Sequence, residues 1–311
     1  MAQPANTFTS YSMVGIREDL ADWIDNISPD DTPFYSKCGK VSATSTNHEW
    51  QTDALEAPAD NKHVQGDDTT STAVTPTVRL GNYSQIFKKA VTIAGTDDGL
   101  NKAGRGNEMG YQILKRTKEI KLDMEYAFFA NNAKVGGSNS VAGELAGIPA
   151  WLTTNTSVGS GGSDPTGDGT DARTDGTTRA LTQTLFDTVM QLGWDNGARF
   201  DTAYLSSGQM NTALGFVGNN NQRNTVSKDA VSKMMDVYMT PWGQVEFQMS
   251  RLVRTRDLII VQSDKWKVAN LRTLKNEPLA KTGDSEKRQL VAELTLECRN
   301  EKASGIVADL S

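Results

Sequence analysis

The residues with the greatest capacity for chemistry lie in one stretch, from His48 to Asp68. This stretch contains both histidines of the 311-residue chain. It also contains six carboxylates: Glu49, Asp53, Glu56, Asp60, Asp67 and Asp68. Imidazole and carboxylate groups are zinc ligands, and a catalytic triad would also require one of these histidines. The stretch is therefore either a metal or catalytic site, or the acidic tip of an arm.

A metal site is the weaker of these two interpretations. Zinc bound by His48 and His63 needs at least one further fixed ligand, and the carboxylates around them are irregularly spaced. The chain also lacks a P-loop, an HExxH motif and a GxSxG motif. We therefore expect no enzyme activity, catalytic residue, cofactor or metal ligand. A metal-dependent enzyme that uses His48 and His63 is kept as an alternative.

Composition limits the partners of the chain. With 32 Lys and Arg residues against 38 Asp and Glu residues, the net charge is −6. Tight binding of nucleic acid needs clustered basic residues, so this balance argues against it. No run approaches the ~18 apolar residues of a membrane helix, and the N-terminus lacks the basic start and apolar core of a signal peptide. We expect a cytosolic or self-assembling protein that is not secreted and has no membrane contact.

The residues around the acidic stretch predict a long β-hairpin. Residues 41–53 and 77–94 contain many β-branched residues and show no helical stripe. We expect them to form the two strands, with residues 54–76 as the tip. At ~3.3 Å per residue, each strand would reach ~40 Å. A two-stranded ribbon of this length cannot bury both of its faces within its own domain, so it needs a partner.

Helical periodicity is clearest between residues 107 and 132. The apolar stripe of this helix consists of Met109, Ile113, Ile120, Met124, Ala127 and Phe128. A helix of this length spans ~39 Å. Shorter helices are predicted over residues 16–27 and 181–192, the second with Gly193 as its C-terminal cap.

The remaining pattern favours strands and loops. Residues 156–178 are dense in Gly, Ser, Thr and Asp and predict a flexible loop. Residues 288–300 alternate between apolar and polar side chains and predict a long amphipathic strand. Because helices and strands are segregated along the chain, we predict an α+β fold.

An acidic arm tip requires a basic surface. Six basic residues lie in one later region: Arg251, Arg254, Arg256, Lys265, Lys267 and Arg272. A contact between the tip and this region is difficult to close within one chain and natural between two chains. We expect the six carboxylates to meet Arg251, Arg254, Arg256 and Lys265 of a neighbouring copy in a salt-sensitive contact.

Five segments of the chain resemble one branch of the major capsid proteins of tailed bacteriophages. They are NISPDDTPFYSKCGK, KEIKLDMEYAFFANN, AGIPAWLTTN, YMTPWGQVEF and EPLAKTGDSEKRQLVAELTLECRNEKASGIVADL. The order of the parts is also similar, from an N-terminal arm through a long hairpin and a spine helix to a returning C-terminal strand. The resemblance covers nearly the whole chain and implies the HK97-like phage capsid fold.

The resemblance implies a division of the chain into five regions. They are an N-terminal arm (1–40), an extended β-hairpin loop (41–95), a peripheral domain (96–145) with a spine helix (107–132), an axial domain (146–275) and a return strand of the peripheral domain (276–311). Gly39, Gly95 and Gly99 lie near the ends of the extended loop. We expect them to act as hinges, because one subunit must fit two slightly different environments.

The resemblance also implies a function. The chain would self-assemble into pentamers and hexamers of an icosahedral phage head that encloses double-stranded DNA without sequence-specific binding. Separate scaffolding, portal and cement proteins are implied partners. The expected location is the virion, after assembly in the host cytoplasm. Another self-assembling virion protein, from a tail or a decoration, is a second alternative.

Overall fold

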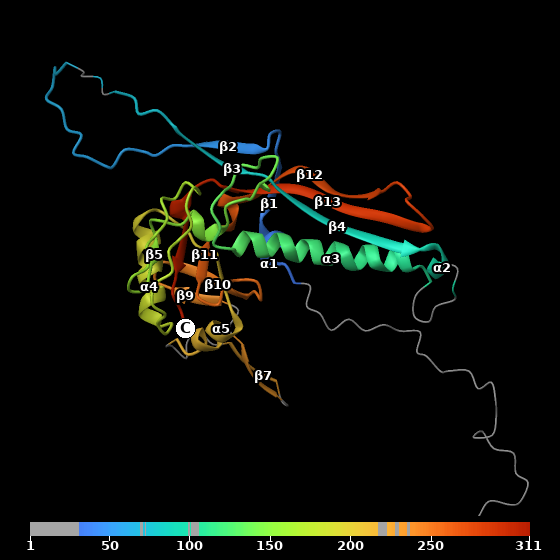
Figure 1. Cartoon of the computed structure of the whole chain (residues 1–311). Helices are drawn as coiled ribbons and strands as arrows, with labels where there is room; N and C mark the ends of the chain where they lie inside the picture. The colour runs from blue at the N-terminus through green and yellow to red at the C-terminus, as the bar shows by residue number, and fades with distance from the viewer. Residues whose placement is uncertain are drawn as a thin grey trace, which may run out of the picture.

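The computed structural model describes residues 31–68, 71, 73–98, 100, 106–216, 223–227, 230–234 and 237–311. The helix predicted over residues 16–27 and the predicted hinge residue Gly99 lie outside them. Figure 1 shows an elongated part, in which a long helix lies along a sheet, and a rounder part built on a second sheet. A thin arm projects from the junction between these two parts.

The elongated part contains a four-stranded sheet. Its strands lie in the order β1 (Gly39–Ser42), β12 (Trp266–Pro278), β13 (Ser285–Cys298) and β4 (Gln85–Ala94). β13 is antiparallel to both of its neighbours, and β1 runs parallel to β12. As a central strand, β13 is buried on both faces over residues 290–298. The expectation of an amphipathic strand is therefore wrong, because Glu293 and Glu297 are buried.

The helix that covers this sheet is α3 (Glu108–Phe129), which lies within the helix predicted over residues 107–132. Asn107 caps it, because its side chain accepts a hydrogen bond from the N–H group of Gly110. Every member of the predicted apolar stripe is buried except Ile113, which is half-buried and packs against the same core. The 3.6-residue period of the apolar side chains is therefore the feature of the sequence that predicts this helix.

The rounder part is organised around a six-stranded sheet. The strand order is β5 (Thr156–Ser157), β14 (Ser304–Val307), β11 (Leu258–Val261), β6 (Thr202–Leu205), β10 (Gly243–Met249) and β9 (Val237–Thr240). The other elements are α1 (Pro33–Lys37), α2 (Gly95–Asp98), α4 (Gln183–Asp195), α5 (Ser207–Ala213), the paired strands β7 (Arg223–Ser227) and β8 (Ala230–Met234), and 3₁₀ turns at Ile148–Ala150, Ser263–Lys265 and Glu301–Ala303.

The described residues form two hydrophobic cores, and both sheets contribute to the first, which also contains Tyr204, Ile259 and Ile306 of the six-stranded sheet. Phe34, Phe128 and Trp266 lie in the core beneath the four-stranded sheet, and Phe186 and Phe247 lie in the core of the rounder part. The architecture is α+β, as predicted. Within the part of the chain that the structure describes, no helix is long and apolar enough to span a bilayer.

The domain boundaries stay a prediction. The structure shows, however, to which sheet one strand of the C-terminal segment belongs. β14 lies within residues 276–311, which the resemblance assigns to the peripheral domain, but it pairs with β11 and β5 in the six-stranded sheet. The C-terminal segment therefore contributes strands to both sheets.

The predicted hairpin is too long. Only β2 (Asn47–Thr52) and β3 (Val78–Tyr83) pair with each other, whereas the sequence predicted strands over residues 41–53 and 77–94. The remaining parts of those two segments belong to the four-stranded sheet as β1 and β4.

The change of partner occurs at Ser84, between β3 and β4. The buried hydroxyl group of Ser84 donates a hydrogen bond to Glu293 at 2.8 Å. Its N–H group donates to the carbonyl oxygen of Thr46 at 2.7 Å. The chain thus leaves β2 and joins β13 without losing backbone hydrogen bonds, and periodicity alone does not reveal such a switch.

The predicted cap at Gly193 is also wrong, because α4 continues to Asp195 and Gly193 lies inside it. A Cβ atom at this position would overlap Cε2 of Phe200. Glycine is therefore required here by the close approach of the Phe200 ring and not by the end of the helix.

Gly193→Ala should destabilise the protein by about 1–3 kcal/mol, because the added methyl group must displace the Phe200 ring in a packed core. Urea unfolding of the unassembled subunit measures this change. Gly208→Ala in α5 is the matched control, since no atom lies within 4 Å of its added Cβ. Removal of that helical glycine should change stability by less than about 1 kcal/mol, in the stabilising direction. Equal effects of the two substitutions would contradict the packing argument.

Candidate functional site

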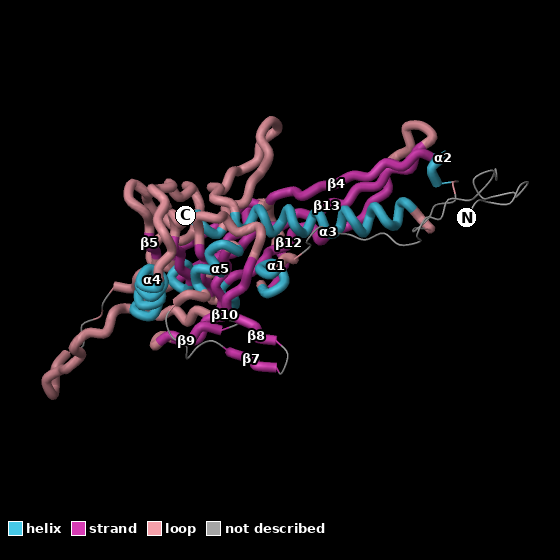
Figure 2. The backbone as a smooth tube through the Cα atoms, turned by 90° about the horizontal axis from the view of Figure 1, so that it is seen from below, coloured by secondary structure: helices cyan, strands magenta, loops and turns pink. Residues whose placement is uncertain are grey.

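The arm consists of β2, β3 and the tip between them, residues 53–77. It extends away from both sheets in Figure 1 and in the perpendicular view of Figure 2. Every described residue of the tip is exposed. Leu55 is 99% exposed, Val64 81% and Val74 93%. Apolar side chains that touch nothing in their own subunit indicate a surface that another molecule covers.

The carboxylates predicted to make assembly contacts all lie on this arm. Glu49 pairs across the ribbon with Arg79 at 2.8 Å, and Asp60 pairs with Lys62 at 2.6 Å. Of the other four carboxylates, Asp67 lies 3.5 Å from His63, and the remaining three make no ion pair with any described residue. The members without an ion pair are Asp53, Glu56 and Asp68. The tip is therefore a solvated acidic surface.

The two histidines lie in different surroundings. Nε2 of His48 lies 3.1 Å from Oε2 of the buried Glu297 at the base of the arm. The exposed His63 lies in the tip, where Nδ1 is 3.5 Å from Asp67. Within the described residues, no group of three or more His, Cys, Asp and Glu side chains could hold a metal ion. His48 thus fastens the arm to β13.

The root of the arm is defined here as residues 46–48 and 80–84, where the arm meets the body. Asn82 is fully buried. Its side-chain amide donates to the carbonyl oxygens of Leu296 at 2.9 Å and Ala146 at 3.3 Å, and its oxygen accepts from the N–H group of Ala146 at 2.9 Å. One side chain therefore ties β3 to both β13 and the segment that follows α3.

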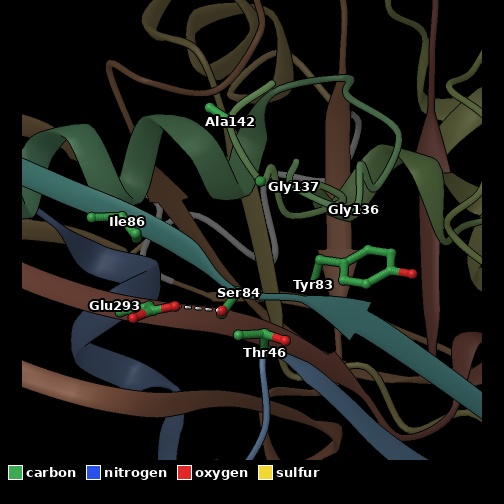
Figure 3. A pocket seen from close by; sticks show the side chains of 9 residues that line it. Thr46, Tyr83, Ser84, Ile86, Gly136, Gly137, Ala142 and Glu293 are labelled. Carbon is green, nitrogen blue, oxygen red and sulfur yellow. Dashed lines mark hydrogen bonds between the residues drawn. The ribbon is translucent and has the colours of Figure 1, made fainter. Parts of the chain in front are cut away.

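A cavity of about 420 Å³ lies beside the root (Figure 3). Tyr83, Ile86 and Glu293 line one side of it, and the loop around Gly136 lines the other. The only carboxylate in the lining is Glu293, which accepts hydrogen bonds from Ser84 and, at 2.8 Å, from Arg272. Each oxygen of this carboxylate already accepts a hydrogen bond, and the described residues of the lining offer no nucleophile paired with a base.

Lys134 connects the root to the loop of residues 156–178. Its Nζ atom donates to the carbonyl oxygens of Gly81, at 2.7 Å, and Asp168, at 2.8 Å. The same ammonium group lies 5.7 Å from the centre of the Trp151 ring. Trp151 in turn contacts Trp50 of β2, with ring centres 5.4 Å apart. The direction in which the arm leaves the body is thus fixed by packed and hydrogen-bonded side chains.

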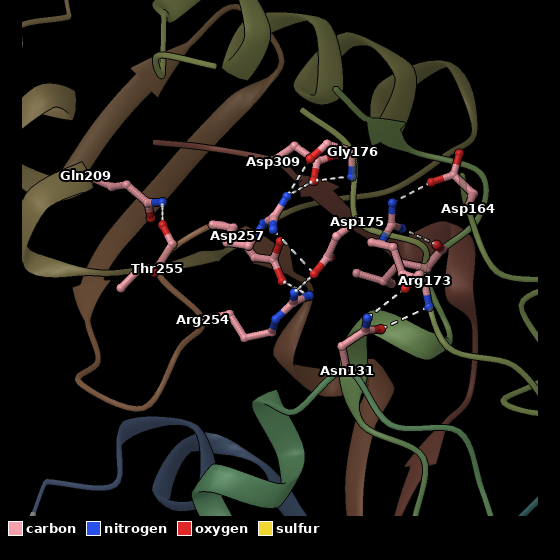
Figure 4. Close-up of polar contacts among 12 residues, drawn as sticks. Asn131, Asp164, Arg173, Asp175, Gly176, Gln209, Arg254, Thr255, Asp257 and Asp309 are labelled. Carbon is pink, nitrogen blue, oxygen red and sulfur yellow. Dashed lines mark hydrogen bonds and ion pairs between the residues drawn. The ribbon is translucent and has the colours of Figure 1, made fainter. Parts of the chain in front are cut away.

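The basic residues predicted to receive a neighbour's arm are in part occupied within the chain (Figure 4). Arg254 donates to Asp175 at 2.5 Å and to Asp257 at 2.9 Å. Arg256 donates to Asp309 at 2.8 Å. Arg254 and Arg256 are therefore not free counter-charges.

The other two predicted basic contacts have fewer partners. Arg251 is exposed, and Lys265 lies 3.5 Å from Asp264 on the surface. An assembly role for Arg251, Arg254, Arg256 and Lys265 stays a prediction.

These arginines hold the loop of residues 156–178, which lacks regular structure beyond β5 but is not simply solvated. Asp309 accepts hydrogen bonds from the N–H groups of Gly159 at 2.9 Å and Gly176 at 2.7 Å, at the two ends of the loop. Burial acts to raise the pKa of Asp309, but these hydrogen bonds and Arg256 lower it on balance. Burial raises the pKa of Asp257 to about 6, despite Arg254.

The predicted hinge glycines do not lie at the root. Gly39 begins β1, where an added Cβ atom would meet the side chain of Lys267 at 2.5 Å. Gly95 begins α2, and its N–H group donates to the carbonyl oxygen of Asp284 at 3.1 Å. Both residues lie at the ends of sheet strands, because β1 and β4 belong to the sheet. Their hinge role stays a prediction.

Sequence reasoning missed the residues that fix the root: Asn82, Ser84, Lys134, Glu293 and Glu297. One signal was available. Two acidic residues, Glu293 and Glu297, interrupt the largely apolar run of residues 290–298, and buried charges require partners. Two of those partners, Ser84 and His48, lie more than two hundred positions away in the sequence, whereas the other two, Arg272 and Arg299, lie nearer.

The model of the family described as SU10 major capsid protein matches residues 3–311. A protein of Escherichia phage Phieco32, named major capsid protein, is 29% identical over 345 residues, which cover 99% of this chain and 97% of that protein.

Solved structures show the fold at much lower identity. The capsid of a native GTA particle has a TM-score of 0.65 at 9% identity, covering 97% of this chain and 98% of that chain. The capsid of cyanophage A-1(L) has a TM-score of 0.64 at 12% identity, with the same coverage. A chain of Microbacterium phage Oxtober96 has a TM-score of 0.62 at 10% identity, covering 94% and 96%.

Asn82→Ala should destabilise the subunit by about 2–3 kcal/mol, because it leaves the buried backbone groups of Ala146 and Leu296 without partners. Thermal and urea unfolding of the unassembled subunit measure this loss. Asn276→Ala is the matched control, since Asn276 is exposed on β12, and its effect should stay within about 0.5 kcal/mol. A negligible effect of Asn82→Ala would show that the root does not depend on these bonds.

Proposed function

This chain belongs to the SU10 major capsid protein family, and we propose that its arm docks on a neighbouring copy as subunits close into pentamers and hexamers. The chain has the HK97-like capsid fold and is a structural subunit of a phage capsid. Heterologous contacts, in which an arm meets a different surface of the next copy, form rings when the rotation closes. The extended arm supplies the first of these two surfaces.

The observation that carries the proposal is the exposure of the arm tip. Residues 53–77 are acidic, carry three nearly fully exposed apolar side chains and contact no other part of their own subunit beyond the ribbon. An exposed ribbon of this kind is stable only when a second molecule covers it. In a shell, the available molecule is another copy of the chain.

The second surface is the face of the four-stranded sheet that points away from α3. Lys89 of β4 pairs with Asp123 of α3 at 2.8 Å, so the adjacent Lys88 points to the opposite face. Strand register places Lys88, Val291 and Lys275 in one row across that face. Lys88 and Lys275 are exposed, and neither makes an ion pair with any described residue. We define this row as the basic sheet face.

The charges and lengths of the two surfaces fit each other. The next row on this face contains Glu277, which is the acidic exception, and Lys287 adds a further positive charge in the row after it. Half of the tip, fully extended, reaches ~40 Å, and the ten residues of β4 extend ~33 Å. The tip is therefore long enough to lie along the sheet of a neighbour. Opposite charges at such a contact set its register and make it sensitive to salt.

We also propose what the shell encloses and which other proteins complete it. The shell encloses double-stranded DNA without sequence-specific contacts, which the net charge of −6 supports. Separate scaffolding, portal and cement proteins would complete the head, and assembly would take place in the host cytoplasm. No catalytic role is proposed. The tail and decoration alternatives, and the enzyme using His48 and His63, have no observation in their favour.

Removal of the tip should abolish assembly and leave folding intact. In the variant, an Asn-Gly turn replaces residues 53–77, so that β2 and β3 form a short hairpin. Its circular dichroism and thermal stability should match those of the parent chain, because the tip packs against nothing in its own subunit. Negative-stain electron microscopy should then show shells or rings for the parent chain and none for the variant. Shells of normal size from the variant would refute the proposal.

The charge fit is tested by reversal. Lys88→Glu with Lys275→Glu should reduce particle yield at least tenfold, because the tip then meets like charges. Added reversal of the arm, Asp67→Lys with Asp68→Lys, should restore assembly. Lys115→Glu with Lys121→Glu on α3 changes the net charge equally on another surface, and we expect it to assemble. If both lysine pairs had the same effect, net charge and not the basic sheet face would be responsible.

A further inference from the structure

Glu125 is a fully buried carboxylate in the middle of the apolar core of the elongated part. It lies on α3, one turn before Phe128 and Phe129. Its two oxygens accept hydrogen bonds from the N–H groups of Phe34, at 2.8 Å, and Tyr35, at 2.7 Å. Burial of a charged carboxylate without a cation beside it costs free energy.

The two N–H groups belong to α1, the first helix that the structure describes. α1 is short and has no side-chain cap of its own. The carboxylate of Glu125 takes the place of that cap from a distant element of the chain. Phe34, which is fully buried, fills the space between Phe129 and Tyr204, with ring centres 5.5 and 5.6 Å away. Docking of α1 and the state of Glu125 are therefore linked in space.

We propose that Glu125 is a proton-controlled latch, in which protonation favours docking of α1 against the long helix α3 and loss of the proton weakens it. When α1 is docked, the carboxylate is sealed among aromatic rings. When α1 lifts away, water reaches the carboxylate and stabilises its charge. The proton is therefore held more tightly in the docked state than in the open state.

The titration of Glu125 supports this direction. Burial raises its pKa from 4.5 to about 7, although the hydrogen bonds from Tyr35 and Phe34 act to lower it. A group whose pKa is raised in the folded state contributes stability that is complete below its unfolded pKa. That contribution is lost as the pH rises through the folded pKa. The latch is thus tight below about pH 4.5 and loosens up to about pH 7.

The charged and titratable groups that face this site come from four elements. α1 and its end contribute Lys37 and Cys38, β6 and the preceding turn contribute Tyr204 and Asp201, β10 contributes Glu246, and β12 contributes Lys267. Lys37 pairs with Glu246 at 2.6 Å, so its charge is compensated. Burial raises the pKa values of both the Cys38 thiol and the Tyr204 phenol, so both stay neutral near pH 7. Glu125 is therefore the group that changes charge here.

Hydrogen exchange of the unassembled full chain tests the latch. The measured quantity is the protection of the amides of residues 34–38 between pH 6 and pH 8, after correction for intrinsic exchange. With the pKa of Glu125 at about 7 in the docked state, protection should fall about tenfold across this interval. Residues 290–298 of β13 serve as an internal reference and should show no such change.

Two variants separate the latch from other causes. Glu125→Gln removes the titrating group and should make the protection of residues 34–38 independent of pH. Glu246→Gln breaks the other link of α1 and should keep the tenfold change. If Glu125→Gln does not fold, the wild-type profile alone decides. Constant protection of residues 34–38 in the wild type, or the same fall in Glu125→Gln, would overturn the proposal. Neither result bears on the docking of the arm.

Discussion

The structure depends on the polar junction at the root of the arm, where one strand stops pairing within the arm and begins pairing within the sheet. Buried polar groups cost free energy unless they find partners. Here Asn82 satisfies backbone groups of Ala146 and Leu296, and Ser84 is satisfied by Glu293 and Thr46. Because the junction is fully paired, the arm can leave the body while β4 completes the four-stranded sheet.

This junction separates two parts of the chain, the body and the arm, which are stabilised in different ways. The body contains two apolar cores, the first of which joins the two sheets. The arm has no core, and its acidic tip and exposed apolar side chains gain stability only from another molecule. A shell protein benefits from this division, because folding and assembly then rely on separate residues. Lys134 keeps the two connected, since it binds both the root and the loop of residues 156–178.

The sequence predicts the long helix well, because the stripe from Met109 to Phe128 has a single period and one buried face. It also predicts the acidic, exposed character of the tip. It does not predict the length of the hairpin, because residues 85–94 have the same β-type composition whether they pair with β2 or with β13. The sequence also does not predict the contacts of Glu293 or Arg254. Some of their partners lie far away in the sequence, as Ser84 does from Glu293 and Asp175 from Arg254, and alternation or clustering of charge says nothing about pairing across such distances.

The most direct measurement is a cryo-electron microscopy reconstruction of particles assembled from the full chain, at a resolution that shows side chains. Our proposal predicts density for residues 53–77 of each subunit along the sheet of an adjacent subunit, over Lys88 and Lys275. Density for the tip folded back on its own subunit, or over a different surface of the neighbour, would contradict it.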